Sequence, residues 1–208
     1  MLKQSIASMT RRRDLLQAKF GFLLFLATLA IFFAASLVAY FVILGQASTS
    51  GGGEFAASDE PVRSIEPMKI PVTFWISAVV MVAVSVLLHL ACRSVHRERL
   101  QPFLRYLFAA FVSSIVFTVI QFIGMYELLV VHLNAADGST KFYGLSFTLS
   151  VLHAVHVFGG LAFLWVVITN SLRGKYDHEQ HVMVDNCASY WHFLDIVWAC
   201  MLLAYSAT

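Results

Sequence analysis

The chain has 208 residues, of which 59% are hydrophobic and only 12% are charged. This balance lies far outside the usual range of soluble globular domains and predicts a membrane protein. The formal net charge is +2, but the basic residues mostly flank apolar runs, so we expect no nucleic-acid partner. The three cysteines form no pattern typical of a disulfide framework, and we expect free thiols.

Five apolar segments follow one another along the chain, each long enough to cross a bilayer as a helix of roughly 20 residues. Residues 1–19 form a basic lead, and residues 46–71 form a long external loop that is rich in Ser, Gly and Pro. The prediction is an all-α, polytopic bundle in one membrane domain. The five predicted transmembrane helices are residues 20–45, 72–92, 106–133, 145–169 and 189–206.

The orientation of these helices follows from the Lys and Arg residues. Of the 14 basic residues, all except Arg63, Lys69 and Lys141 fall on the side of the membrane that holds the N-terminus. Short loops rich in Lys and Arg stay in the cytoplasm. We therefore expect a cytoplasmic N-terminus and an external C-terminus.

The third predicted helix is more polar than the first. Ser114, Thr118 and Gln121 share one face at helical spacing, and Glu127 lies near the external end. Polar side chains of this kind most often form hydrogen bonds to a neighbouring membrane helix. A proton route along this face is the alternative, and Glu127 can also extend outwards to the interface.

The fourth predicted helix carries His153, His156 and Gly160 on one face. Two imidazoles therefore lie beside a position at which another helix can approach closely. The two histidines are three residues apart on one helix, so they cannot bind opposite faces of one haem. His89 and His192, on the second and fifth helices, lie at similar predicted depth, which leaves a membrane cytochrome as an alternative.

The fifth predicted helix begins with a dense polar and aromatic cluster. His192 and Asp195 are neighbours at i, i+3, and Trp191, Asp195 and Trp198 line one face. A carboxyl group inside a membrane helix is costly unless it has a partner. This helix must therefore pack against polar groups, either in this chain or in another.

None of the common catalytic motifs occurs in the sequence. His-Glu-x-x-His, a Gly-rich phosphate loop, Cys-x-x-Cys and a Ser/His/Asp set are absent, and His178 and His181 do not match a zinc signature. We expect no active site and no metal site in this chain. The candidates for helix packing, subunit contact or lipid contact are Gln121, Glu127, His153, His156, Gly160, Trp191, His192, Asp195 and Trp198.

Two stretches carry a specific resemblance. Residues 190–198 read Tyr-Trp-His-Phe-Leu-Asp-Ile-Val-Trp, and residues 153–160 read His-Ala-Val-His-Val-Phe-Gly-Gly. Gln121, followed by the tripeptide Tyr126-Glu127-Leu128, and the first helix add to the pattern. Over nearly the whole chain these residues resemble subunit III of the haem–copper respiratory oxidases, the family of cytochrome c oxidase.

The resemblance implies a non-catalytic subunit III of a proton-translocating terminal oxidase in the bacterial inner membrane. In that family, subunit III contacts the catalytic subunit I, supports its stability and proton uptake, and binds phospholipid. Haem and copper are then expected in partner subunits, with subunit II and a small subunit IV as further partners.

The chain departs from the long family members in two ways. Five helices are typical of the short bacterial form, which lacks the first two helices and with them one arm of a lipid cleft. Leu29 stands where many members have a membrane glutamate, so no role of that glutamate is carried over to this chain.

We expect Asp195 and His192 to form hydrogen bonds across the fourth and fifth helices, in a packing role rather than a proton-carrying one. Two other functions compete with the oxidase reading. The nearer one is an accessory protein of a nitric oxide reductase, from the same family. The more distant one is a small membrane transporter, although neither an internal repeat nor a helix broken by proline supports it.

Overall fold

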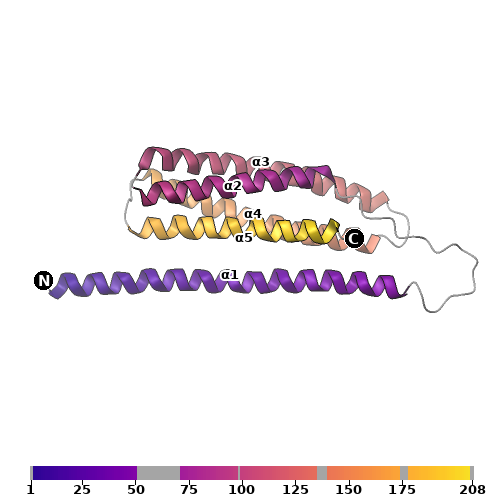
Figure 1. Ribbon diagram of the computed structural model, residues 1–208, viewed down its shortest axis with the longest axis horizontal. Coiled ribbons are helices and arrows are strands. Elements are labelled where there is room, and N and C mark those ends of the chain that lie inside the picture. Colours follow the sequence, from indigo (N-terminus) through magenta and orange to yellow (C-terminus); the bar gives the residue numbers. More distant parts are fainter. Residues whose placement is uncertain (1, 51–70, 98, 135–139, 174–177, 207–208) are drawn as a thin grey trace, which may run out of the picture.

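The computed structural model describes residues 2–50, 71–97, 99–134, 140–173 and 178–206. Within these ranges the chain forms five helices and no strand (Figure 1). Each helix contains a segment long and apolar enough to cross a membrane. The predicted all-α, multi-pass membrane fold is confirmed. The helices are α1 (Leu2–Ser50), α2 (Val72–His96), α3 (Leu100–Asn134), α4 (Thr140–Leu172) and α5 (His178–Ser206).

The helices are longer than the apolar runs from which they were predicted. α1 includes nearly all of the basic lead and continues to Ser50, and α5 begins at His178, before its apolar run. A helix satisfies its own backbone groups, so Arg, Lys and Gln extend it readily beyond the hydrocarbon region. Of the predicted loop at 46–71, residues 51–70 lie outside the described residues. Pro71 precedes α2 with φ −56°, an angle that suits a helix start.

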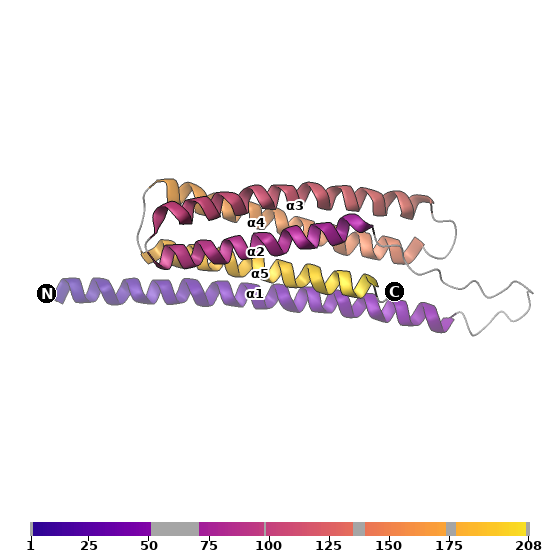
Figure 2. The same cartoon turned by 45° about the horizontal axis from the view of Figure 1, so that its top comes forward.

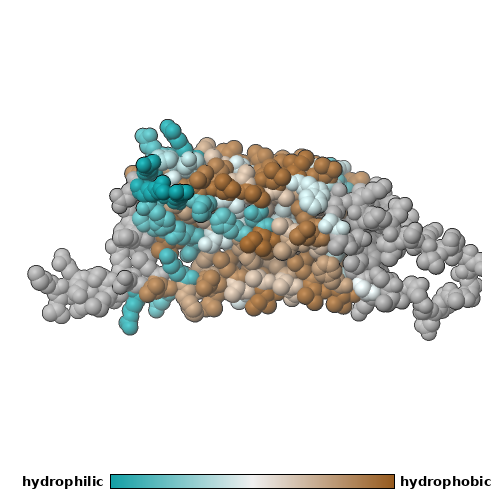
Figure 3. Space-filling model, in the orientation of Figure 1, coloured by the Kyte–Doolittle hydropathy of each residue, from teal (hydrophilic) through white to brown (hydrophobic). Residues whose placement is uncertain are grey.

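Helices α2 to α5 form a bundle in which α2 and α4 each contact both α3 and α5. The long α1 lies outside this bundle, against α5 and α4 (Figures 1 and 2). At one end of the bundle α2 and α4 finish and α3 and α5 begin, and hydrophilic side chains gather there (Figure 3). We call it the basic end, because it carries Arg93, Arg97, Arg99, Arg105 and Arg173, all exposed.

Aromatic side chains fill the centre of the bundle. α1 contributes Leu29, Phe33 and Tyr40, which are spaced by four and seven residues and so lie on one stripe. Most of the other α1 side chains that the structure describes are apolar and exposed, as expected for a helix that faces lipid or another subunit. The largest fully buried side chains are Trp191, Trp198, Tyr40, Tyr205, Phe74, Phe103 and Phe117.

Candidate functional site

In the part of the chain that the structure describes, polar side chains form several separate groups between helices, and these groups do not converge on one reaction centre. Among the described residues no three His, Cys, Asp or Glu side chains are arranged to hold a metal ion. Cys92, Cys187 and Cys200 are free thiols, as predicted.

His153 lies at the centre of the bundle, fully buried between aromatic rings. Its imidazole stacks on Trp198 of α5 at a centroid distance of 5.1 Å, and Phe33 of α1 meets it edge-on at 6.4 Å. Neither ring nitrogen has a hydrogen-bond partner in the described part of the chain. His153 thus links three helices through ring contacts.

His156 lies one turn from His153 and takes part in the same packing. Its Nδ1 lies 2.7 Å from the backbone oxygen of Leu152, and its ring meets Phe33 at 5.1 Å. The hydroxyl of Tyr190 on α5 donates to the backbone oxygen of His156 at 2.9 Å. These contacts place His156 at the level of the α5 aromatic cluster.

At Gly160, α4 approaches α5 closely. A Cβ atom at this position would lie 3.1 Å from Cε1 of Tyr190 and 3.2 Å from Cε2 of Trp191. Trp191 is fully buried, and its Nε1 has no hydrogen-bond partner among the described residues. The sequence predicts a close helix contact beside the two histidines. The structure has this contact at Gly160, and the partner helix is α5.

A further polar contact joins α4 and α5 at the end opposite the basic end. The Tyr205 hydroxyl donates to the backbone oxygen of Ser146 at 3.0 Å and lies 3.3 Å from the Ser150 hydroxyl. Tyr40 of α1 packs against the same ring at 5.8 Å. This contact was not predicted from the sequence, although Ser146, Ser150 and His153 share one face of α4.

The polar face of α3 bonds to α2. Ser77 donates to Oε1 of Gln121 at 3.1 Å, and Thr73 donates to Oε2 of Glu127 at 2.8 Å. Between these two bonds, a Cβ atom on Gly124 would overlap the ring of buried Phe74. The predicted interhelical hydrogen bonds of α3 are thus present at Gln121, and Glu127 accepts a bond from Thr73 while remaining exposed.

His192 and Asp195 lie against α2. The prediction that they bond to the fourth helix is wrong, because His192 Nδ1 lies 3.0 Å from the hydroxyl of Ser85 on α2. The Asp195 carboxyl lies beside the same hydroxyl. His89 is the ring neighbour of His192 at 6.5 Å, so the predicted match in depth holds. The face of α5 that carries these groups turns towards α2, and α4 meets the aromatic side of the helix.

A porphyrin does not fit between His89 and His192. On one side of the pair, Ser85 bonds to His192 across the α2–α5 interface. On the other side, Cys92 Sγ lies 3.8 Å from the backbone oxygen of Val184. Direct contact on both sides leaves the two helices no gap of macrocycle size, and the membrane-cytochrome alternative is not supported by this geometry.

The basic end holds a polar contact that the sequence analysis did not identify. His96 Nε2 of α2 lies 3.1 Å from Oδ1 of Asp185 of α5. The ring of His181, one turn earlier on α5, lies 5.5 Å from that of His96. His181, Asp185 and His192 share one face of α5. Their spacing would have indicated this face if the predicted fifth helix had begun at His178 and not at residue 189.

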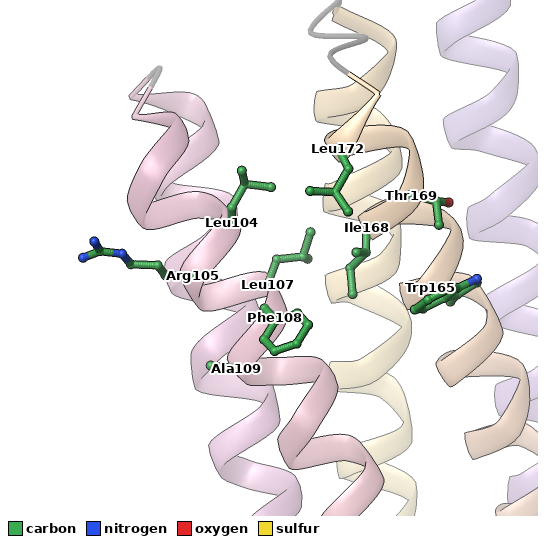
Figure 4. Close-up of a pocket in the computed structure, with 9 residues that line it drawn as sticks. All are labelled: Leu104, Arg105, Leu107, Phe108, Ala109, Trp165, Ile168, Thr169 and Leu172. Carbon is green, nitrogen blue, oxygen red and sulfur yellow. The ribbon is translucent and has the colours of Figure 1, made fainter.

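A groove with a volume of about 610 Å³ lies between α3 and α4 near the basic end. Figure 4 shows Leu104, Leu107 and Phe108 of α3 and Leu172 of α4 directed into the space between the two helices. Arg105 projects away from this space (Figure 4). The lining is almost wholly apolar, so the groove suits a hydrocarbon chain better than a polar substrate.

Comparison with known proteins gives the family. A family model described as "Cytochrome c oxidase subunit III" matches residues 12–206. The chain belongs to the cytochrome c oxidase subunit III family. Within the family, "Cytochrome c oxidase subunit 3" of Drosophila melanogaster is 29% identical over 185 residues, with 86% of this chain and 65% of the relative covered.

Other curated relatives with the same description give a similar picture. The protein of Locusta migratoria is 26% identical over 188 residues, with 89% of this chain and 67% of the relative covered. That of Phoca vitulina is 27% identical over 180 residues, with 86% and 65% covered. The chain thus spans about 65% of the length of most of these relatives.

Proposed function

We propose that this chain is the non-catalytic subunit III of a haem–copper terminal oxidase, the complex that couples reduction of O2 to proton translocation. The family match over residues 12–206 carries this proposal. The interhelical groups support it, since each links helices by ring contacts or single hydrogen bonds and none combines a nucleophile, a base and an open cavity. Haem and copper then belong to partner subunits.

The proposed partner in direct contact is the catalytic subunit I, with subunit II and a small subunit IV as further members of the complex. The role of this chain is to stabilise subunit I and to sustain proton uptake during turnover. The positive-inside distribution supports a bacterial inner-membrane protein with a cytoplasmic N-terminus and an external C-terminus. In this orientation the basic end faces the cytoplasm, where protons enter.

Purification of the tagged chain in mild detergent tests the proposal. We expect a haem–copper oxidase to be recovered with it, identified by its haem absorbance and O2 reduction. Recovery of a nitric oxide reductase instead would favour the accessory-protein alternative. Recovery of the chain alone, with a pigment of its own or with solute transport in vesicles, would contradict the proposal.

Asp195 gives a prediction about how the chain acts in the complex. Asp195→Asn is expected to leave the bound amount of this chain and the ratio of protons pumped per electron close to wild type. The asparagine oxygen can still accept from the Ser85 hydroxyl, so the contact between α5 and α2 is kept. Asp195→Leu, which removes the acceptor, is expected to loosen the chain from the complex. Loss of pumping in the asparagine variant, with the chain still bound, would instead indicate proton transfer through Asp195.

We also propose that the groove between α3 and α4 holds a phospholipid acyl chain. Leu104→Trp is expected to fill part of the groove and to lower the number of lipids that remain bound after purification. Native mass spectrometry of the complex measures this number. Leu104 and Phe108 of α3 both line the groove. Val119 is on the same helix but does not line it, so Val119→Trp serves as the control. Equal lipid content in the two variants would argue against an acyl chain in the groove.

A further inference from the structure

Polar side chains form a continuous line along the contact between α2 and α5. Their positions on α2 are spaced by four and seven residues, and those on α5 by four, seven and three, so each set lies on one helix face. From Ser85 to His96, α2 advances about 16 Å. We call this line the α2–α5 stripe; its members are Ser85, His89 and His96 of α2 and His181, Asp185, His192 and Asp195 of α5.

Direct contacts join the members of the stripe at two levels. Near the basic end, His96 bonds to Asp185 and packs beside His181. Deeper in the span, His192 bonds to Ser85. Between the two levels, Cys92 Sγ of α2 lies 3.8 Å from the backbone oxygen of Val184 of α5.

The stripe lies at the surface of the bundle. His89 and His96 are exposed, and His192 and Asp195 are only partly buried. In Figure 3 a band of hydrophilic colour continues from the basic end into the apolar middle of the face that carries α2 and α5. In the described part of the chain, α1 contacts α4 and α5 but not α2, so it does not cover the α2 side of the stripe.

Lipid cannot satisfy such a surface. α2 has 25 residues, so a stripe of about 16 Å from its basic end reaches close to the middle of the span. Headgroups and water can serve His96 and Asp185, but His89, His192 and Asp195 lie deeper, among hydrocarbon tails that offer no hydrogen bonds. Ionisable groups at such depth nearly always face protein or a water-filled cavity. His89 has no hydrogen-bond partner within the described residues, and His192 uses only its Nδ1 in the bond to Ser85.

A second copy of this chain would not complement the stripe. A two-fold axis along the membrane normal places groups of equal depth opposite one another. Imidazole would then meet imidazole, and the Asp195 carboxyl would meet its own copy. Like charges opposite each other disfavour association, so a partner with different side chains at these depths fits better.

We propose that the α2–α5 stripe is the surface on which a transmembrane helix of a partner oxidase subunit docks, with hydrogen-bonding side chains opposite His89, His192 and Asp195. This inference rests on the function proposed above and adds the face through which the chain binds. The partner helix lies along the contact between α2 and α5 and covers the exposed apolar side chains that flank the stripe. α1, beside α5, and the outer face of α3, beside α2, are left to lipid or to other contacts.

Site-specific photocrosslinking in the intact complex tests this surface. The photoreactive residue p-benzoylphenylalanine replaces Val86 of α2 or Ile196 of α5, which flank the stripe and are 53% and 63% exposed. Val119 of α3 and Val38 of α1, which are 55% and 62% exposed, serve as matched controls away from the stripe. We expect crosslinks to a partner subunit several-fold more often from the stripe positions than from the controls.

A pair of variants supplies a second readout. His89→Phe removes an exposed imidazole without changing the core and is expected to reduce severalfold the share of purified oxidase that retains this chain. Val119→Phe, an equally exposed change on α3, is expected to leave that share unchanged.

The outcomes separate the two proposals. If the chain is purified with the oxidase but its stripe positions crosslink only to lipid, or only to a second copy of this chain, the docking surface is wrong and the proposed function stands. Equal retention of the His89→Phe and Val119→Phe variants likewise counts against the stripe. If no oxidase is purified with the chain, the proposed function fails, and the docking surface fails with it.

Discussion

Replacement of Trp198 by alanine is expected to destabilise the bundle by about 3–5 kcal/mol, the usual range for truncation of a large buried aromatic side chain. Trp198 is fully buried. Its indole meets Phe74 of α2 edge-on at 5.2 Å and stacks on His153 of α4 at 5.1 Å. Removal of the indole leaves a cavity shared by three helices, and His153 loses the ring on which it stacks.

Unfolding of the purified chain in mixed micelles of mild detergent and SDS, followed by circular dichroism, measures this loss. Trp75→Ala is the matched control, because Trp75 lies on the outer face of α2 and is 47% exposed. We expect the SDS concentration at the midpoint to fall sharply for Trp198→Ala and little for Trp75→Ala. Equal shifts would mean that the stacked arrangement at the centre of the bundle does not hold the helices together.

The number and type of the helices could be predicted from the sequence because membrane insertion depends on apolar length. Their ends could not be predicted in the same way. α5 begins at His178, well before its apolar run, because polar residues continue a helix outside the hydrocarbon region. The contact of His96 with Asp185 could not be predicted for this reason, since Asp185 precedes the predicted helix at 189–206.

Periodicity predicts which residues share a helix face, but it does not predict which helix that face meets. His153, His156 and Gly160 were placed together correctly, and the structure adds that Tyr190 and Trp191 lie against Gly160. For His192, the same reasoning chose the wrong neighbour, because nothing in the spacing of α5 shows that α2 lies beside it. The pairing of helices in the bundle is decided by side-chain fit across sequence-distant segments, which one helix pattern does not contain.

Gly160→Leu is expected to destabilise the contact between α4 and α5 by about 1–3 kcal/mol or more, through overpacking. Even the first added carbon would lie 3.1–3.3 Å from ring atoms of Tyr190 and Trp191. These rings cannot easily move, because Trp191 is fully buried and the Tyr190 hydroxyl is bonded to the backbone oxygen of His156. The remaining leucine carbons have to force the two helices apart.

Gly159→Leu separates this packing effect from the general effect of replacing glycine in a helix. Both substitutions gain roughly 1 kcal/mol of helix propensity, so the difference between them reports packing alone. Gly159 is exposed, and a Cβ there would meet only the Tyr190 hydroxyl, at 3.4 Å. We expect Gly159→Leu to unfold near the wild-type SDS concentration and to stay bound to the oxidase, whereas Gly160→Leu unfolds earlier and is lost from the complex during purification. The α2–α5 stripe depends on the position of α5, so displacement of α5 from α4 should also misplace His192 and Asp195. Equal behaviour of the two leucine variants would contradict this coupling.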